Sequence, residues 1–309
     1  GEATPAQIAA LLIGLRVKGE TPDEVAGAAD AMRHAMVRLE AERPDDLVDT
    51  CGTGGGTVPT FNISTAAALL AAGLGVRIAK HGNRSFTTQC GSADVLEALD
   101  VPIDVGVDVM ERVLREAGIV FMFAPLMHPA MRHVGPVRRE LAIPTVMNIV
   151  GPLANPASAG RQVIGVADAR RVPLIAGALR TLGTVHALVV HGEPGMDEIS
   201  PLGVTHVQEV LDGTVREWTL DPTRYGIRTG RPDELASGPP AANAALVTAV
   251  LENEAAPTAI AAVVLNAAAA LYVSGGGPTE FGDAITAARE GVRDGVGIEA
   301  LERLKRAYA

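Results

Sequence analysis

The sequence predicts an α/β protein with a small N-terminal helical domain and a large domain that contains a mostly parallel central sheet flanked by helices. Residues 1–43 hold two apolar-periodic segments, each preceded by a helix cap. From residue 47 onward, short apolar runs typical of buried strands alternate with helical segments, and glycine-rich turns join strands to helices. We therefore expect a helical domain over 1–43, joined by helices from about 106–145, and an α/β domain over 47–309.

The composition is that of a globular protein and disfavours several classes. Hydrophobic residues make up 48% of the 309 residues and aromatic residues only 3%, so we expect a core of Ala, Val, Leu and Ile. The net charge of −10, without a long basic run, disfavours a general nucleic-acid binder. Two cysteines, Cys51 and Cys90, are too few for a disulfide framework and favour a cytoplasmic location. The most apolar run, 257–273, is too short to span a membrane and is expected to be a buried helix.

The two N-terminal helices are expected to begin in the same way. Thr4 is followed by proline and, three residues later, by Gln7, which is the pattern of a capping box, and Gly19 ends this helix. Thr21 and Glu24 repeat the pattern for the second helix. Residues 43–46 then read as a linker to the α/β domain.

The stretch from Asp49 to Ser92 is expected to carry the functional site. A strand over 47–52 ends in glycine, and the glycines at 54–56 allow backbone geometry or a close ligand approach that a side chain would prevent. Polar residues then open an alanine-rich helix, whose first N–H groups and dipole favour a bound anion. These residues are Thr60, Asn62, Ser64 and Thr65.

A second polar loop follows the next predicted strand, 76–80. Lys80 and Arg84 would lie at the carboxyl end of this strand, where parallel sheets bind ligands. A glycine turn alone is often only a tight turn, and a basic loop alone is often only solvated. Two such loops at successive strand ends together predict phosphate binding.

The remaining sequence continues the alternation of strands and helices. The expected elements are a helix capped by Ser92, a buried strand at 119–125, a helical stretch at 128–141, an extended segment at 145–156, strands at 161–167 and 186–192 around a helix through 174–182, a hairpin at 207–220 and a C-terminal helix at 300–309. Asp212-Gly213 in the hairpin suits a type I′ turn.

An acidic pair, Asp197 and Glu198, closely follows the strand at 186–192, so it should lie at the same edge of the sheet as the glycine turn. An Asp-Glu pair in a loop is more often simply solvated. Here the pair would face a phosphate site, and Mg²⁺ is commonly held by one or two carboxylates together with phosphate oxygens. The sequence therefore predicts a Mg²⁺ site at this pair.

Five segments resemble, in order and spacing, the anthranilate phosphoribosyltransferase family, part of the wider nucleoside phosphorylase and phosphoribosyltransferase-like group. They are GTGGGTVPTFNIST, KHGNRSFTTQCGSADVLEAL, HPAMRHVGPVRREL, NIVGPLANP and HGEPGMDEIS. The resemblance implies a cytoplasmic, homodimeric glycosyltransferase of tryptophan biosynthesis. Such an enzyme transfers the phosphoribosyl group of phosphoribosyl pyrophosphate to the amine of anthranilate and gives N-(5-phosphoribosyl)anthranilate and pyrophosphate. Whether a glutamine amidotransferase partner exists is left open.

The resemblance also implies roles for individual residues. Phosphoribosyl pyrophosphate would be bound by Gly52, Thr53, Gly54, Gly55, Thr60, Asn62, Ser64, Thr65, Lys80 and Ser92. Anthranilate would be bound by Gly52, His81, Asn83, Arg138 and Pro152, and Mg²⁺ by Ser64, Asp197 and Glu198. His81 is the only candidate for a catalytic side chain, and the sequence leaves open whether it orients substrate or collects a proton.

The implied reaction is a substitution at the anomeric carbon of the ribose, assisted by stabilisation of the departing pyrophosphate and by positioning of the amine. Two positions depart from the family pattern. Gly56 stands where an acidic residue is common, and Pro144 stands where an arginine is common. Both departures are compatible with an active enzyme, and the sequence leaves open their effect on metal and acceptor binding.

Two rival functions remain open at this point. A pyrimidine nucleoside phosphorylase would share the glycine-rich phosphate loop but would have little use for the acidic pair. A non-catalytic paralogue that binds nucleic acid would need a basic groove, against which the net charge and the retained Asp197 and Glu198 argue.

Overall fold

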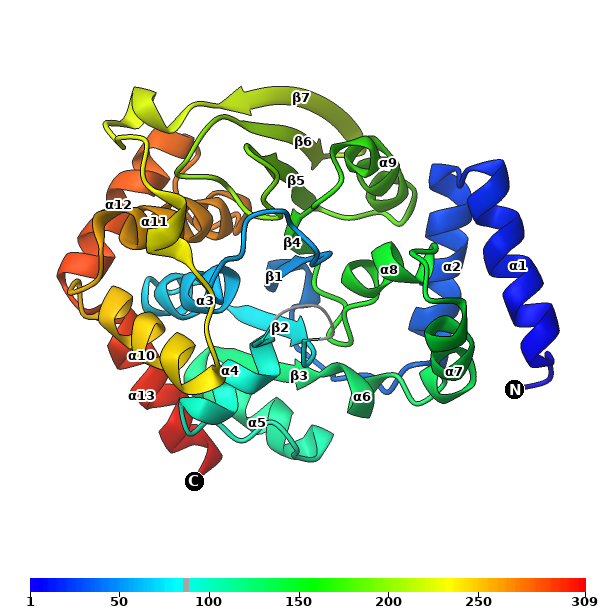
Figure 1. Ribbon diagram of the computed structural model, residues 1–309. Coiled ribbons are helices and arrows are strands. Elements are labelled where there is room, and N and C mark those ends of the chain that lie inside the picture. The colour runs from blue at the N-terminus through cyan, green and yellow to red at the C-terminus, as the bar shows by residue number, and fades with distance from the viewer. Residues whose placement is uncertain (86–88) are drawn as a thin grey trace.

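The computed structural model describes residues 1–85 and 89–309, and the centre of this part of the chain is a seven-stranded sheet (Figure 1). Its strand order is β3-β2-β1-β4-β5-β6-β7. The strands are β1 (Val48–Gly52), β2 (Ile78–Gly82), β3 (Ile119–Phe123), β4 (Arg161–Gly165), β5 (His186–Gly192), β6 (Thr205–Leu211) and β7 (Thr214–Leu220). Strands β1 to β5 pair in parallel, and β6 and β7 add an antiparallel edge. The predicted mostly parallel sheet is confirmed.

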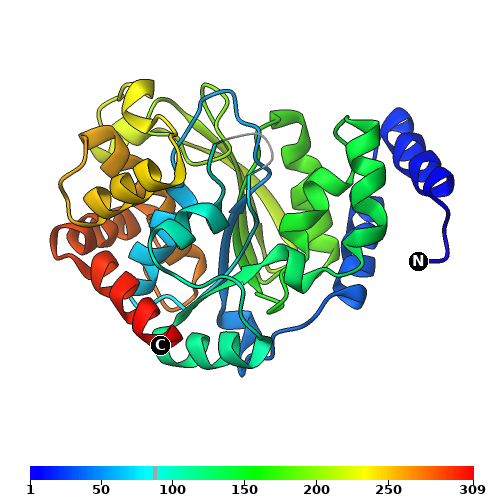
Figure 2. The same cartoon turned by 60° about the horizontal axis from the view of Figure 1, so that its bottom comes forward.

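One side of the sheet carries helices from the middle and the end of the chain (Figure 2). They are α3 (Ile63–Gly73), α4 (Ser92–Ala98), α5 (Val107–Ala117), α10 (Pro240–Leu251), α11 (Pro257–Val273), α12 (Phe281–Arg293) and α13 (Val296–Tyr308). Helix α11 packs against α3, β1, β4 and β5, and most of its side chains are buried. The prediction of a buried helix at 257–273 is confirmed. Its many alanines allow close packing on α3.

The other side of the sheet carries the two N-terminal helices and three helices from the middle of the chain (Figure 2). They are α1 (Pro5–Lys18), α2 (Pro22–Ala35), α7 (Met131–Leu141), α8 (Met147–Val150) and α9 (Val172–Thr181). Helix α9 packs on β5 and β6, α2 packs on α9 and α8, and α1 packs on α7. The shorter helices of the described chain are α6 (Ala124–Met127) and the 3₁₀ turns η1 (Pro44–Asp46), η2 (Gly151–Leu153), η3 (Ala169–Arg171), η4 (Pro222–Tyr225) and η5 (Pro232–Leu235).

Local signals place several elements as expected. The hydroxyl of Thr4 accepts a hydrogen bond from the N–H of Gln7, whose side chain accepts one in return from the N–H of Thr4. Thr21 and Glu24 form the same reciprocal pair at the start of α2. In the β6–β7 hairpin, Asp212 and Gly213 have φ of 49° and 73°, as the predicted type I′ turn requires.

Two predictions of local structure were wrong. Residues 145–156 are largely helical, in α8 and η2, instead of extended. The side chain of Asn148 accepts a hydrogen bond from the N–H of Thr145, which stabilises a helical turn in a run that is rich in β-branched residues. Ser92 is the first residue of α4 and not its cap, because the carboxylate of Asp94 accepts the hydrogen bond of the Gly91 N–H.

The division into a helical and an α/β domain stays a prediction, but the contacts show which helices lie together. Helix α7 packs on α1, whereas α5 packs against β3 and α13. The residues expected to join the helical domain therefore need correcting: 131–141 lie with it and 107–117 do not.

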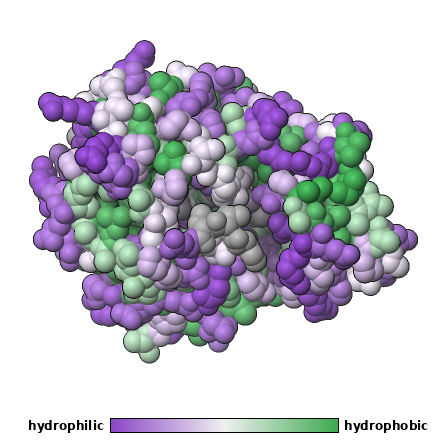
Figure 3. All heavy atoms as spheres, viewed as in Figure 1, coloured by the Kyte–Doolittle hydropathy of each residue, from purple (hydrophilic) through white to green (hydrophobic). Residues whose placement is uncertain are grey.

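The outer face of α1 exposes apolar side chains, and Figure 3 shows hydrophobic residues gathered at this end of the molecule. The exposed fractions are 64% for Leu11 and 81% for Val17. In the described ranges 1–85 and 89–309, every helix is too short or too polar to cross a membrane.

Candidate active site

A cavity of about 460 Å³ opens at the carboxyl ends of the parallel strands. The chain continues from β1 to β2 and β3 on one side and then crosses to β4 on the other side of β1, so the cavity lies at the switch point where α/β sheets bind ligands. Its volume suits a small organic ligand. The predicted residues in its wall are Gly52, Thr53, Gly54, Gly55, Thr60, Asn62, Ser64, Lys80, His81, Asn83, Ser92, Arg138, Asp197 and Glu198.

The glycine loop after β1 is docked on the loop that carries the acidic pair. The N–H of Gly54 donates a hydrogen bond of 2.8 Å to Oδ2 of Asp197, and the N–H of Thr57 donates one of 2.9 Å to the carbonyl of Gly195. A Cβ atom at Gly52 would lie 2.8 Å from Oδ2 of Asp197, so this contact requires a glycine. The predicted proximity of the glycine turn and the acidic pair is confirmed.

The same crowding accounts for Gly56. A Cβ atom there would lie 3.1 Å from Oδ1 of Asp197 and 3.0 Å from the carbonyl of Gly195. An acidic side chain at this position would add a third negative group close to Asp197. Glycine instead leaves room beside the two carboxylates.

The two carboxyl groups of the acidic pair both have raised pKa values. Burial and the charge of Asp197 raise the pKa of Glu198 to about 8, although Lys80 and a hydrogen bond from the Ser64 backbone oppose the shift. Burial also raises the pKa of Asp197, against the hydrogen bond from Gly54. Among the described residues, no cluster of three or more His, Cys, Asp or Glu side chains could hold a metal. A carboxylate pair with a nearby hydroxyl fits Mg²⁺, which retains several waters and binds phosphate oxygens.

Lys80 provides a fixed cation on the cavity floor. Its side chain is 3% exposed, and Nζ donates hydrogen bonds to the carbonyl of Thr50, to Oγ1 of Thr50 at 3.4 Å and to Oγ of Ser64 at 3.2 Å. Burial lowers the pKa of Lys80, whereas the charges of Asp49 and Glu198 oppose the change. These contacts fix the ammonium group beside the hydroxyl of Ser64.

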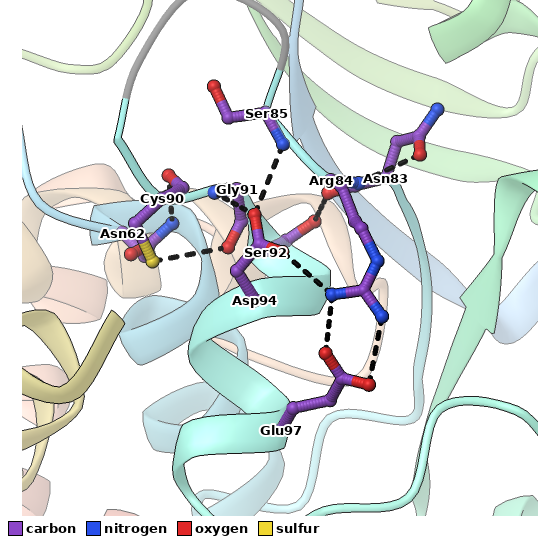
Figure 4. A network of polar contacts seen from close by, with 9 residues as sticks. All are labelled: Asn62, Asn83, Arg84, Ser85, Cys90, Gly91, Ser92, Asp94 and Glu97. Atoms are coloured by element: carbon purple, nitrogen blue, oxygen red, sulfur yellow. Dashed lines mark hydrogen bonds and ion pairs between the residues drawn. The ribbon is translucent and has the colours of Figure 1, made fainter. Parts of the chain in front are cut away.

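The loop between β2 and α4 is held by polar contacts (Figure 4). The guanidinium of Arg84 bonds Asp94 at 2.8 Å and Glu97 at 2.9 Å, and its charge is thereby paired. The expectation that Arg84 attracts an anionic substrate together with Lys80 therefore needs correcting, because Arg84 fastens the loop to α4. Residues 86–88 of the segment that carries the family resemblance lie outside the described residues.

Asn62 and Ser92 also take part in holding this loop (Figure 4). The amide of Asn62 donates to the carbonyl of Cys90 at 3.2 Å, and the hydroxyl of Ser92 donates to the carbonyl of Asn83 at 3.2 Å. Both residues line the cavity, so they shape the wall while their side chains bind the backbone.

His81 is neutral in this environment. Burial, followed by the nearby His128 and Lys80, lowers its pKa to about 3. Its Nε2 lies 3.2 Å from Nε2 of His128, a residue to which the sequence assigned no chemistry. A group with this pKa stays unprotonated near neutral pH, which favours orientation of substrate over collection of a proton.

Arg138 lines the cavity, as do Met147 and Asn148. Its guanidinium is half-buried, burial lowers its pKa, and it has no acidic partner within 1–85 and 89–309. A buried guanidinium without a counterion is suited to bind a carboxylate.

Two predicted residues do not reach the described cavity wall. Thr65 is buried beside Lys80 at a small internal void, and its hydroxyl has no hydrogen-bond partner. The carbonyl of Pro152 accepts a hydrogen bond of 2.8 Å from Gln162, behind the wall. Met147 and Asn148 line the cavity instead. The sequence signal that could have found them is their position directly after the arginine-rich helix.

The fold and the cavity define an α/β protein with packed N-terminal helices and a cavity lined by a glycine loop, an acidic pair and the cations Lys80 and Arg138. The model of the glycosyl transferase family, a/b domain, matches residues 44–298, and that of the helical bundle domain of the same family matches 1–36. An anthranilate phosphoribosyltransferase of Anaeromyxobacter sp. (strain K) is 50% identical over 304 residues, which cover 98% of this chain and 89% of that protein. The chain therefore belongs to the glycosyl transferase family, among the anthranilate phosphoribosyltransferases.

Solved structures agree with this assignment. The anthranilate phosphoribosyltransferase from Thermus thermophilus has a TM-score of 0.93 and 41% identity, over 99% of this chain and 91% of that one. The enzyme from Saccharomyces cerevisiae in complex with PRPP and Mg has a TM-score of 0.89 and 28% identity, over 98% and 85%. The yeast enzyme in complex with 4-fluoroanthranilate has a TM-score of 0.87 and 27% identity, with the same coverage.

Proposed function

We propose that this chain transfers the phosphoribosyl group of phosphoribosyl pyrophosphate to the amine of anthranilate and releases pyrophosphate, a step of tryptophan biosynthesis. The observation that carries the proposal is the meeting, in one cavity, of the glycine loop, the Asp197–Glu198 pair and the unpaired guanidinium of Arg138. The yeast relative, whose structures contain PRPP and Mg or 4-fluoroanthranilate, supports the same pair of substrates and the same cation.

The pyrophosphate would lie between the glycine loop and Lys80. The N–H of Gly55 in the glycine loop and the ammonium of Lys80 would bind its oxygens. Ser64, Asp197 and Glu198 would hold Mg²⁺, which supplies positive charge for the departing pyrophosphate. Gly54 and Asp197 bond each other directly, so these residues would align the leaving group and the cation together.

The acceptor would lie at the end of the cavity that contains Arg138. The guanidinium would bind the carboxylate of anthranilate, and Asn83, Met147 and Asn148 would enclose the ring. Neutral His81 would orient the amine toward the anomeric carbon. Because an aromatic amine is already unprotonated near neutral pH, its attack needs positioning more than base catalysis.

Loss of anthranilate fluorescence is the direct test. The purified protein is mixed with anthranilate, phosphoribosyl pyrophosphate and Mg²⁺, with a parallel sample that lacks the metal. Metal-dependent loss is the expected result. Metal-independent phosphorolysis of uridine or thymidine, without consumption of anthranilate, would instead support the rival phosphorylase.

The quaternary structure and the location in the cell are further parts of the proposal. A homodimer is supported by the exposed apolar side chains of Leu11 and Val17 on α1, which a second copy would cover. Sedimentation of the wild type beside Leu11→Glu tests whether a second copy covers this face of α1. Identical masses for the two proteins would contradict an interface at α1. A cytoplasmic location is supported by the small number of cysteines, because two are too few for a disulfide framework.

A further inference from the structure

The turn at residues 151–154 is held by side chains from several parts of the chain. The carbonyl of Pro152 accepts a hydrogen bond of 2.8 Å from Nε2 of Gln162, and that of Leu153 accepts one of 2.8 Å from Nε of Arg33. The backbones of Gly151 and Ala154, at the two ends of the turn, are hydrogen-bonded by His81 and His128. Four successive residues of one short turn thus bind four buried or half-buried side chains.

These four side chains come from separate layers of the fold. Gln162 belongs to β4 and His81 to β2, so two of them come from the sheet. His128 follows α6, and Arg33 lies in α2, within the region matched by the helical bundle domain. The turn is therefore the place where the helical bundle and the sheet bind the same piece of backbone.

The turn is also tied to the sheet at its end. The side-chain amide of Asn155 donates to Oδ2 of Asp49 at 2.8 Å and to the carbonyl of Ala79 at 2.9 Å. Oδ1 of the same Asp49 accepts the N–H of His81 at 3.1 Å. The side chain of His81 is therefore bonded to the turn at Gly151. Its backbone N–H is bonded to Asp49, the same residue that binds Asn155 at the end of the turn.

His81 connects the turn to the acceptor end of the cavity. It lines the cavity itself, and its ring contacts that of His128, with the two centroids 4.9 Å apart. A movement of the turn would shift both rings, because each is hydrogen-bonded to the turn. The glycine loop and the Asp197–Glu198 pair are held by a separate contact, the hydrogen bond from Gly54 to Asp197, in which the turn takes no part.

We propose that Arg33 is a positioning residue for the acceptor: through the carbonyl of Leu153 it holds the 151–154 turn, and thereby His81, in the place that anthranilate requires. The inference rests on the proposed function. It implies that a side chain of the helical bundle controls binding of the acceptor and leaves binding of phosphoribosyl pyrophosphate unchanged.

The test compares Arg33→Met with Arg38→Met. Arg38 lies just beyond α2 and is exposed, so its replacement removes the same charge without removing the bond to Leu153. For R33M we expect the KM for anthranilate to rise about tenfold, which corresponds to loss of about one hydrogen bond to a charged group. The KM for phosphoribosyl pyrophosphate should stay within about twofold, and R38M should resemble the wild type. Arg33→Lys, which retains a donor, should recover part of the loss.

Hydrogen exchange gives a readout that does not depend on turnover. The N–H groups of Ala154 and Ala157, bonded within and just after the turn, should exchange faster in R33M than in R38M. If R33M does not fold, Arg33→Gln and Arg33→Lys are compared with R38M in the same two measurements.

Separate outcomes overturn the inference and the proposed function. Equal acceptor KM values for R33M and R38M, in active proteins, would overturn the inference, and so would a parallel rise of both substrate KM values. Equal exchange at Ala154 and Ala157 would also overturn it. If the folded wild type consumes no anthranilate, the proposed function fails, and the exchange comparison still decides whether Arg33 holds the turn.

Discussion

The N–H of Gly54 and the carboxylate of Asp197 form a hydrogen bond of 2.8 Å although the two residues are 143 positions apart. The contact joins the glycine loop after β1 to the loop after β5. The hydrogen bond therefore links the loop proposed to bind phosphate directly to a residue proposed to bind Mg²⁺.

Neutralising the acidic pair should abolish turnover without unfolding the protein. Asp197→Asn combined with Glu198→Gln retains the shapes and an acceptor for Gly54 but removes two charges. We expect kcat to fall by at least about a hundredfold, because the departing pyrophosphate loses its bound cation. Turnover is measured across a Mg²⁺ titration, with thermal melting as the folding control. Normal activity at limiting Mg²⁺ would remove the metal assignment.

Gly165 should tolerate no side chain. A Cβ atom there would lie 1.7 Å from the backbone carbonyl of Asp197, a distance that forces the acidic loop to move. We expect Gly165→Ala to lower the free energy of unfolding by at least about 2 kcal/mol and to weaken Mg²⁺ binding. Gly14→Ala in α1, where no atom lies within 4 Å, is the control and should be neutral or stabilising. Urea unfolding of both variants compares them, and similar stabilities would contradict the close approach of β4 to the acidic loop.

Arg138 should determine affinity for the acceptor. Arg138→Ala removes the half-buried guanidinium proposed to bind the carboxylate of anthranilate, a bond to a charged group worth about 1.5–3 kcal/mol. The KM for anthranilate should rise at least about tenfold while that for phosphoribosyl pyrophosphate changes little. Arg139→Ala removes a neighbouring exposed arginine and serves as the control. An unchanged KM in R138A would place the aromatic site elsewhere.

Glu209 should make the stability of the β5–β7 edge depend on acid pH. Its side chain is fully buried and accepts hydrogen bonds from His186, Trp218 and Arg216 at 2.8–2.9 Å. Burial alone would raise the pKa of Glu209, but the bonds from His186, Arg216 and Trp218 outweigh it and lower the pKa to about 2. Because the folded pKa lies below the unfolded one, the stabilisation is present above about pH 4.5 and is lost as the pH falls toward 2.

The measurement for Glu209 is urea unfolding of the wild type and Glu209→Gln between pH 7 and pH 2. Between pH 7 and pH 2, the free energy of unfolding of the wild type should fall by at most about 3 kcal/mol more than that of the variant. Parallel pH curves for the two proteins would show that the carboxylate of Glu209 contributes no pH-dependent stability.

Sequence reasoning succeeded where a signal and its structural consequence are close along the chain. Thr21 and Glu24 are three residues apart and form the predicted cap, and Asp212-Gly213 form the predicted turn. It failed at residues 145–154, where β-branched residues favour an extended chain but four side chains from distant elements bind a helical turn. Local preferences are weak, and tertiary contacts override them.

For the candidate site, the sequence predicted the position of the loops but not the partners of their charged side chains. The glycine run, Lys80 and the acidic pair could be placed at one edge of the sheet because the carboxyl ends of parallel strands meet there. The free or paired state of each charge could not be predicted. Arg84 is paired with Asp94 and Glu97, whereas Arg138 has no acidic partner in the described chain.

The sequence by itself determined the α/β class, the order of most elements, the family resemblance and the loops that carry the residues proposed to bind phosphate and metal. Periodicity, caps and motifs involve residues that are close together in the sequence, so they can be recognised without knowledge of distant contacts. Only the tertiary structure decided which side chains face the cavity, that Thr65 and Pro152 stay behind its wall, and that Arg33 holds the 151–154 turn. These features depend on burial and on partners far apart in sequence, and both arise only when the helical bundle packs against the sheet.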